Sequence, residues 1–543
     1  MHYLERLRIA VNKFWNKAAL NNINGESFTY GDMATSIEKL HIAFEEAGIN
    51  KGDKIAIAAR NGARWGMAYL AVNTYEAVAV PILADFTPES TCFLVNHSDS
   101  IALFTTADKW EKLDLAKMPK IKLVFDAETF EILWCADESF KQTYADIDSI
   151  MARKYPDGFS AKDVSYPTDN LDKLSTINYT SGSTGDPKGV MLTYGNFSSM
   201  IDYCQRHVEA NEKYNMVSML PMAHMYGLVI EFIYPLCNGT AVYWLGKAPT
   251  PATLIAAFKQ VKPYLLVTVP LVMEKIFKSK IKPVLDKPTI KVLTKIPGIN
   301  TIIFNKIRKG LTDAFGGNIQ EFIMGGAPVN PDIEKWFRKI KLPYLVGYGM
   351  TEATPLLAYE HYSKYVPGSC GKAVDTATVR IDSPDPENIP GEIQAKGSNI
   401  CIGYYKNPEA TANAFTEDGF LKTGDLGVMD KEGNIFIRGR IKNMILGPSG
   451  QNIYPEEIES VVCNQNYVLE SVVVDRKGKL VALVFPDYNK MQEDGVKNED
   501  VMNSIIKGSN KRLPSYSHLS KVEFVDNPFE KTPKMSIKRF LYK

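Results

Sequence analysis

The feature that most constrains the fold is an alternation of strand-like and helical patterns through the first 440 residues. Residues 29–49, TYGDMATSIEKLHIAFEEAGI, form one helical pattern that Thr29 begins as N-cap and Gly48 ends. Strand-like runs recur as KIAIAA, IALFTT, KLVFDA, LVTVP and EFIMGGAP. This βα rhythm is typical of sheets covered by helices, so we expect an α/β fold.

The length of the predicted helices and strands changes after Arg440, where they become short. They are IKNMIL, a helix from Pro455 to Cys463, a hairpin SVVVDRKGKLVALVF turning at Lys477 and Gly478, a helix around Asp500 to Ile506, and a strand KVEFV. The polar residues 489–500 favour a loop. We therefore predict a large N-terminal α/β domain of several subdomains over residues 1–439 and a small α+β lid domain over residues 440–543.

Composition indicates a folded, globular chain and gives no sign of nucleic-acid binding. Of the 543 residues, 45% are hydrophobic and 23% charged, and the net charge is only +1. Residues 511–543 are an exception, with eight Lys or Arg against three acidic residues. This basic run is either a solvated face or a surface that meets a phosphate-bearing ligand.

The seven cysteines show no C-x-x-C spacing, which favours reduced thiols in a cytoplasmic protein. The N-terminus lacks the layout of a signal peptide, and no run reaches the roughly 18 apolar residues of a membrane span. Phe14 and Trp15 lie between Lys13 and Lys17. They favour an amphipathic helix docked on the core, with peripheral membrane contact as the alternative.

Residues 179–189, YTSGSTGDPKG, combine glycines, hydroxyls and a cation directly after a strand-like run. Glycines let backbone N–H groups curve around an anion, hydroxyls add donors, and lysine adds a charge. The order is not that of a Walker loop, because Asp186 and Pro187 precede Lys188 and no Ser or Thr follows it. We predict a phosphate-binding loop formed by Thr180, Ser181, Gly182, Ser183, Thr184, Gly185 and Lys188.

Two further motifs fit the rest of a nucleotide. MGGAP at residues 324–328 leaves a strand end without large side chains, so a flat ligand can lie against Gly325, Gly326 and Ala327. GYGMTEATP at residues 347–355 contains Tyr348, Gly349, Thr351 and Glu352, suited to base stacking, close approach, an α-phosphate hydrogen bond and Mg²⁺ binding. A turn with a capping box would explain its glycines and Glu352 but not its tyrosine.

Acidic and basic residues follow in KTGDLG and IRGRIKN. Asp425 comes just after a glycine turn and could accept hydrogen bonds from both ribose hydroxyls, although a turn aspartate is the ordinary alternative. Arg440 can reach ribose or phosphate, and Lys442 lies where the longer predicted elements give way to shorter ones.

With these motifs in fixed order, the chain resembles the acyl-adenylate-forming superfamily over essentially its whole length. That superfamily includes acyl-CoA synthetases, luciferases and peptide-synthetase adenylation domains. LPMAHMYG at residues 220–227, GSNICIGYYKNPEAT at residues 397–411, and a lysine at position 442 most resemble bacterial long-chain fatty acid–CoA ligases. The resemblance implies ATP, Mg²⁺ and coenzyme A, a fatty acid substrate, and a mobile lid that pivots near Lys442.

The resemblance also implies roles for single residues. His224 would lie beside the acyl carboxylate, and Gly450 would leave a channel open for the pantetheine thiol. Thr180, Lys188, Thr351 and Glu352 would act on the phosphates. The family's tail lysine is replaced, because TPKMSIKR puts Ser536 in its place; Lys534 and Lys538 flank that position, and on an extended strand all three side chains would share one face.

Two alternatives share these motifs. One is a ligase that hands the acid to an acyl carrier protein, and the other is a catalytically impaired binder of acyl groups and nucleotides. A second departure, Asn443 for the usual aspartate, removes a charge beside the hinge. The sequence leaves open the length of the acid, the acceptor and the oligomeric state.

Overall fold

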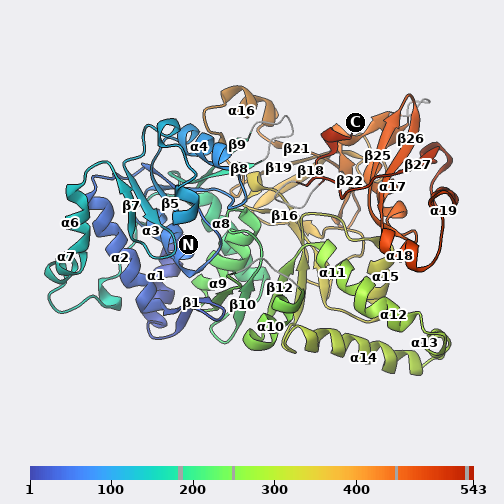
Figure 1. Ribbon diagram of the computed structural model, residues 1–543, viewed down its shortest axis with the longest axis horizontal. Helices are drawn as coiled ribbons and strands as arrows, with labels where there is room; N and C mark the ends of the chain where they lie inside the picture. Colours follow the sequence, from blue (N-terminus) through green and yellow to red (C-terminus); the bar gives the residue numbers. More distant parts are fainter. Residues whose placement is uncertain (181–186, 247–250, 447–450, 532–536, 543) are drawn as a thin grey trace.

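A computed structural model describes residues 1–180, 187–246, 251–446, 451–531 and 537–542 of the chain. Within these ranges, two extended sheets dominate the N-terminal part (Figure 1). The seven-stranded sheet runs in the order β14 (Tyr344–Val346), β13 (Glu321–Met324), β12 (Leu265–Thr268), β10 (Asn215–Ser218), β11 (Ala241–Trp244), β1 (Ala18–Asn22), β2 (Ser27–Thr29). The eight-stranded sheet runs β20 (Gly403–Tyr404), β9 (Lys188–Thr193), β8 (Leu174–Thr180), β4 (Val78–Pro81), β3 (Lys54–Ala58), β5 (Ser100–Thr105), β6 (Leu123–Asp126), β7 (Ile132–Cys135).

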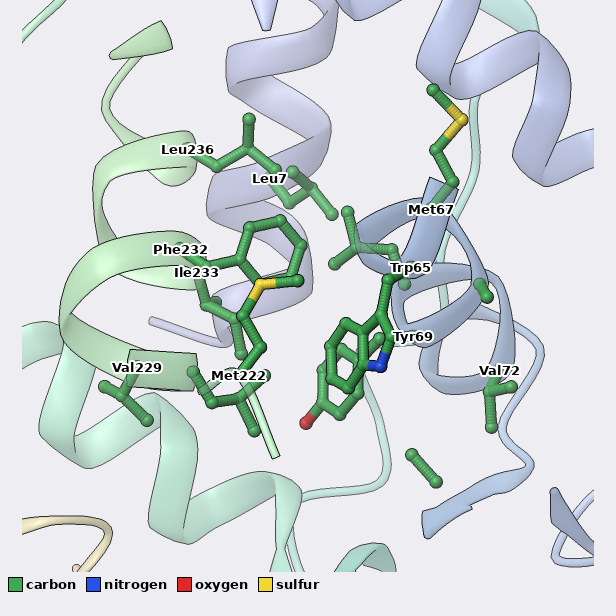
Figure 2. Close-up of a cluster of buried hydrophobic side chains, with 14 of the residues drawn as sticks. Leu7, Trp65, Met67, Tyr69, Val72, Met222, Val229, Phe232, Ile233 and Leu236 are labelled. Carbon is green, nitrogen blue, oxygen red and sulfur yellow. The ribbon is translucent and has the colours of Figure 1, made fainter. Parts of the chain in front are cut away.

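Helices between the two sheets bury the largest hydrophobic core. They include α1 (Tyr3–Lys13), α2 (Tyr30–Glu46), α3 (Ala63–Thr74), α8 (Tyr194–His207), the π-helix η3 (Gly227–Ile233) and α9 (Tyr234–Cys237). Figure 2 shows side chains of α1, α3 and the η3–α9 segment meeting in this core. Trp65 stacks on Tyr69 with ring centroids 5.8 Å apart, and the Tyr69 hydroxyl lies 2.9 Å from the hydroxyl of Thr176 in β8. The core thus fixes β8, which leads into the predicted phosphate loop.

Other helices cover the remaining faces. α4 (Pro88–His97), α6 (Ser139–Ala145) and α7 (Ile147–Lys154) flank the eight-stranded sheet or α2. A second core lies under α10 (Pro251–Val261), α11 (Pro270–Ile276), α12 (Lys282–Leu285), α13 (Pro288–Leu293), α14 (Ile299–Ala314) and α15 (Pro331–Lys339). An antiparallel sheet of β18 (Ala377–Asp382), β19 (Gly391–Gly397), β21 (Leu421–Met429) and β22 (Ile435–Arg440) follows. A separate three-stranded sheet contains β15 (Tyr348–Gly349), β16 (Leu356–Tyr359) and β17 (Lys372–Ala373), and α16 (Pro408–Ala414) contacts β20 and β21.

The C-terminal part is a small α+β unit with a hydrophobic core of its own. It contains β23 (Ile445–Leu446), β24 (Asn452–Ile453), α17 (Pro455–Val462), β25 (Val468–Arg476), β26 (Lys479–Pro486), α18 (Tyr488–Glu493), α19 (Asn498–Asn510) and β27 (Lys521–Phe524). The predicted hairpin turn is confirmed, because Lys477 and Gly478 both adopt positive φ between β25 and β26. Figure 1 shows this small unit beside the large part, and the mixed sheets and helices of both confirm the predicted α/β fold class.

One prediction for the small unit is wrong, because residues 488–493 form helix α18 within the segment expected to be a loop. The Asp487 side chain caps the helix by accepting from the Lys490 N–H, and Met491 is buried. A local cap and one core contact outweigh the polar composition of the segment. α19 also extends on both sides of the predicted residues 500–506.

Several other predictions are confirmed. Thr29 and Asp32 form a reciprocal capping box at the start of α2. Helix α1 buries Leu4, Leu7 and Val11 in the core, as expected of a docked helix, although it ends at Lys13 and leaves Phe14 and Trp15, both partly buried against the core, just beyond it. All seven cysteines are described and are free thiols. In the described part of the chain, no helix is both long and apolar enough to cross a bilayer.

Candidate functional site

The MGGAP and GYGMTEATP motifs meet at the carboxyl ends of parallel strands. The Gly325 N–H donates to the carbonyl of Thr268 at the end of β12 (3.1 Å), and the Gly347 N–H donates to the carbonyl of Met324 at the end of β13 (2.8 Å). Ligands of α/β sheets bind outside the carboxyl ends of the strands. The two motifs therefore share one edge of the seven-stranded sheet, in the position where a ligand is expected.

Lys188, at the end of the predicted phosphate loop, is linked to Glu352 through Tyr404. β8 and β9 pair antiparallel with Thr180 opposite Lys188, and β20 pairs with β9 so that Tyr404 lies beside Val190. The Lys188 ammonium lies 5.0 Å from the centre of the Tyr404 ring, and the Tyr404 hydroxyl donates to Glu352 Oε1 at 3.0 Å. A cation, an aromatic ring and a carboxylate from three separate motifs thus form one chain of contacts.

The Glu352 turn is held by residues that the sequence analysis used only as a family marker. Asn399 donates its side-chain amide to the carbonyls of Ala353 (3.0 Å) and Leu356 (2.8 Å), and the Cys401 N–H donates to the Glu352 carbonyl (2.8 Å). The Thr354 hydroxyl donates in return to the Asn399 carbonyl at 2.8 Å. Residues 397–411 therefore brace Thr351 and Glu352, which are both buried. In the sequence, the signal for this role was an asparagine, Asn399, within residues 397–411.

A second cluster joins Tyr348, Asp425 and Arg440. The Tyr348 hydroxyl donates to Asp425 Oδ2 at 2.7 Å, and Arg440 Nε lies 2.9 Å from Asp425 Oδ1. Burial raises the pKa of the Asp425 carboxyl, with repulsion from Glu352 and Glu456 adding to the rise, while Arg440 and Tyr348 oppose it. This contact between the Tyr348 hydroxyl and Asp425 was not anticipated from the sequence, and the stacking role of Tyr348 remains a prediction.

The LPMAHMYG segment lies between the phosphate-loop strand and MGGAP. Asn178 of β8 donates its amide to the carbonyl of Ala223 at 2.9 Å, next to the half-buried His224. The Tyr226 hydroxyl donates to the carbonyl of Ile323 at 3.3 Å. A Cβ on Gly325 would come within 3.2 Å of the Tyr226 ring, so the glycine allows the segment to pack closely. Ala223 and Tyr226, on either side of His224 in the chain, thus contact the strands that lead into the predicted phosphate loop and into MGGAP.

Glu231 in η3 holds the start of this segment and was missed by the sequence analysis. Its Oε2 accepts from the Ser218 hydroxyl (3.0 Å) and from the N–H groups of Met219 (3.0 Å) and Leu220 (2.9 Å). The side chain is completely buried, and burial raises the pKa of its carboxyl to about 8. A buried glutamate among apolar residues is the only sequence signal for this role.

We expect Glu231→Gln to remove part of the pH dependence of stability. Folded Glu231 keeps its proton up to about pH 8, whereas an unfolded glutamate loses it near pH ~4.3, so its stabilisation is full below that pH and is lost as the pH rises to about 8. Denaturant unfolding at pH 5 and pH 8 should show a smaller loss of free energy in the variant than in the natural protein. An identical loss in both proteins would contradict the assigned protonation. Glu231→Leu, which leaves three donors without their acceptor, should cost about 2 to 4 kcal/mol at pH 5 and less at pH 8, where the natural protein has lost much of the Glu231 stabilisation.

The predicted hinge lies in the short helix η6 (Ile441–Asn443), directly after β22. Asn443 donates its amide to Glu456 Oε1 of α17 at 2.6 Å, a bond that an aspartate carboxylate could not donate. Arg539 near the C-terminus binds Glu459 and lies 3.8 Å from Glu456. Asn443, which follows Lys442 in the chain, therefore contacts the same helix, α17, that Arg539 binds.

The tail itself is only partly described. Lys538 forms an ion pair with Glu530 at 3.2 Å. Other cations of the basic C-terminal run also bind carboxylates: Arg512 with Asp332, Lys521 with Glu523, and Lys531 with Glu470. These pairs favour a charge-balanced surface for this run. The Arg512 pair at 2.7 Å also joins the small unit to α15 of the large part.

Several predicted site residues lie outside the described residues. They are Ser181, Gly182, Ser183, Thr184, Gly185, Gly450, Lys534 and Ser536. Within the described ranges, no group of three His, Cys, Asp or Glu side chains could hold a metal ion.

Two family models match the chain. The family model described as "AMP-binding enzyme" matches residues 7–405, and that described as "AMP-binding enzyme C-terminal domain" matches residues 442–542. Long-chain-fatty-acid–CoA ligase 5 of Rattus norvegicus is 27% identical over 80% of this chain and 67% of its own length. Long-chain-fatty-acid–CoA ligase 4 of Saccharomyces cerevisiae is 27% identical over 92% of this chain and 76% of its own length.

Among solved structures, ATP-bound MatB from Rhodopseudomonas palustris superimposes with a TM-score of 0.79. It is 22% identical and covers 100% of this chain and 98% of its own, so it shares the fold. The first family model ends at residue 405 and the second begins at residue 442, within η6, so together they span most of the sequence. The chain belongs to the AMP-binding enzyme family.

Proposed function

We propose that the protein activates a fatty acid with ATP, through an acyl-AMP intermediate, and transfers the acyl group to coenzyme A. The observation that carries this proposal is the contact chain from Lys188 through Tyr404 to Glu352. It brings a cation and a carboxylate beside the predicted phosphate loop, which phosphoryl chemistry needs and an ordinary polar surface loop does not. Family membership supports the same chemistry.

The first step joins the acid to AMP. A carboxylate oxygen attacks the α-phosphorus of ATP, the bond to the β-phosphate oxygen breaks, and pyrophosphate leaves with the electron pair. Catalysis of such a step is mostly positioning and charge neutralisation. Thr180 and Lys188 would hold phosphate oxygens, Thr351 would donate to the α-phosphate, and His224 would lie beside the acyl carboxylate.

Asp425 and Arg440 suit the ribose. Asp425 accepts one hydrogen bond from Tyr348 and one from Arg440. Because an ionised carboxylate has about four acceptor positions, two remain for ribose hydroxyls. Gly325, Gly326, Ala327 and Gly349 would leave backbone exposed to the flat base.

Glu352 would hold Mg²⁺ together with the phosphates. Mg²⁺ usually binds one or two carboxylates plus substrate phosphates and water. A single glutamate, with one of its oxygens accepting from the Tyr404 hydroxyl, fits this coordination. Bound there, the ion would neutralise charge on the phosphates during transfer. Tyr404 would fix the orientation of the carboxylate that receives it.

The second step transfers the acyl group from AMP to the thiol of coenzyme A, which displaces AMP from the acyl carbon. We place the domain border between residues 439 and 440 and the pivot of the lid at Lys442, next to the Asn443–Glu456 bond. Rotation there would exchange the tail for the loop containing Gly450, so the two steps would use different faces of the lid.

We expect AMP formation to be greatest with long-chain acids. We expect the thioester to form only when coenzyme A is present. Two relatives named as long-chain-fatty-acid–CoA ligases support this choice of acid. A panel of acids from two to eighteen carbons, assayed for pyrophosphate, AMP and thioester with and without coenzyme A, tests it. Thioester formed only on an acyl carrier protein would favour that acceptor, and binding of acid and ATP without pyrophosphate release would indicate an impaired enzyme.

A further inference from the structure

The charge of the chain is concentrated in one segment. Residues 275–309 contain ten Lys or Arg and a single acidic residue, Asp286, although the whole chain carries only +1. The rest of the chain is therefore net acidic. Nine of the ten cations are lysines, which suit a surface of diffuse negative charge better than paired recognition of one phosphate.

This segment forms an outlying arm of the large part. It runs from α11 through the π-helix η4 (Phe277–Ile281), α12 and α13 into α14, which lies along the lower margin of Figure 1 with α13 at its right-hand end. α13 contains no buried residue, and Leu311 is the one buried residue of α14. Most of the arm's surface thus faces solvent.

Apolar side chains stand out from the same surface. Ile302 is 69% exposed and Val292 is 63% exposed, and Val284, Ile296 and Ile299 are also exposed. On α14, Phe304, Ile307 and Leu311 pack inward on the second core, whereas Ile299 and Ile302 are three residues apart and share an outer face. α14 therefore has a second apolar face that the core does not use.

The lysines around these apolar residues are largely available for an external partner. Asp286 binds Lys282 and Lys291 at 2.5 and 3.2 Å, and Lys278 donates to the Cys463 carbonyl at 3.3 Å. Lys287, Lys295 and Lys306 form no ion pair with any carboxylate of the described ranges. An excess of positive charge thus surrounds Val292, Ile296 and Ile302.

We propose that residues 284–309 of this arm dock the protein on the surface of an anionic phospholipid bilayer. Lysines attract anionic headgroups, and isoleucine and valine tips bury in the boundary between headgroups and acyl chains. A nucleic acid fits less well, because the exposed apolar residues are aliphatic and offer no stacking surface. The proposal is independent of the proposed activity, since membrane binding needs no substrate.

The test is co-sedimentation of the full chain with vesicles of phosphatidylcholine alone or with one third phosphatidylglycerol. We expect binding to the anionic vesicles, weakening with salt, and little binding to the neutral ones. Lys287→Gln/Lys295→Gln should weaken binding about twenty-fivefold, from about fivefold per lysine, and Val292→Ser/Ile302→Ser about tenfold or more. Ile389→Ser/Leu469→Ser, which replaces residues of similar type exposed elsewhere, should leave binding unchanged.

Four results would overturn the proposal. They are absence of binding to either vesicle, equal binding to both, equal loss in the arm and control variants, and salt-sensitive retention on duplex RNA without vesicle binding. Dimerisation that Ile302→Ser abolishes, seen by sedimentation velocity in place of vesicle binding, would assign the arm to a second copy of the chain. Thermal unfolding of each variant should match that of the natural protein, because these side chains are exposed.

Discussion

Glu352→Gln is expected to lower pyrophosphate release by at least about a hundredfold while the protein stays folded. The substitution keeps an oxygen that can accept from the Tyr404 hydroxyl but removes the negative charge that would hold Mg²⁺ against the phosphates. Stopped assays of pyrophosphate with acid and ATP measure the effect, and thermal unfolding checks the fold. Near-normal release would contradict the assigned role of Glu352.

Tyr404→Phe is the matched control for this prediction. It keeps the ring beneath Lys188 and removes only the hydroxyl that donates to Glu352. We expect a smaller loss of pyrophosphate release than for Glu352→Gln, because the carboxylate charge remains while its orientation is less fixed. A larger loss would place the essential group on Tyr404.

Loss of a tail lysine is expected to reduce adenylation about a hundredfold, the usual effect of removing one preorganised electrostatic group. Since Ser536 occupies the family's lysine position, Lys534→Ala or Lys538→Ala should show this loss, with Lys534 favoured because Lys538 also occurs in the family pattern. Lys538 binds Glu530 in the structure, so it would have to leave that pair to reach a phosphate. Thioester formation from supplied acyl-AMP should survive in both variants.

Ser536→Lys and Glu530→Gln supply the controls for the tail. Ser536→Lys restores the family's charge and should leave adenylation unchanged or faster. Glu530→Gln removes the partner of Lys538 and should not slow adenylation if that lysine acts on ATP. Normal adenylation by both alanine variants would mean that the tail contributes no catalytic cation, and that either Lys188 suffices or the lid acts in another way.

Local patterns determined the elements and the order of the motifs. The Thr29 capping box, the turn at Lys477 and Gly478, and the strands of the βα rhythm depend on neighbouring residues, so the sequence alone predicted them. The phosphate loop stays a prediction from its glycines and hydroxyls, because residues 181–186 lie outside the described residues. Segment 488–493 was mispredicted because one cap and one buried methionine decided its conformation.

Only the tertiary structure decided which motifs touch. Tyr404 and Glu352 are 52 residues apart, and Tyr348 and Asp425 are 77 apart, so no local pattern could reveal either bond. Glu231 gained its role because folding buried it beside three donors, and Asn399 because it came to face the Glu352 turn. Sequence determines helices, strands and motifs through short-range sterics and hydrogen bonds; pairing across the fold is set by how whole elements pack.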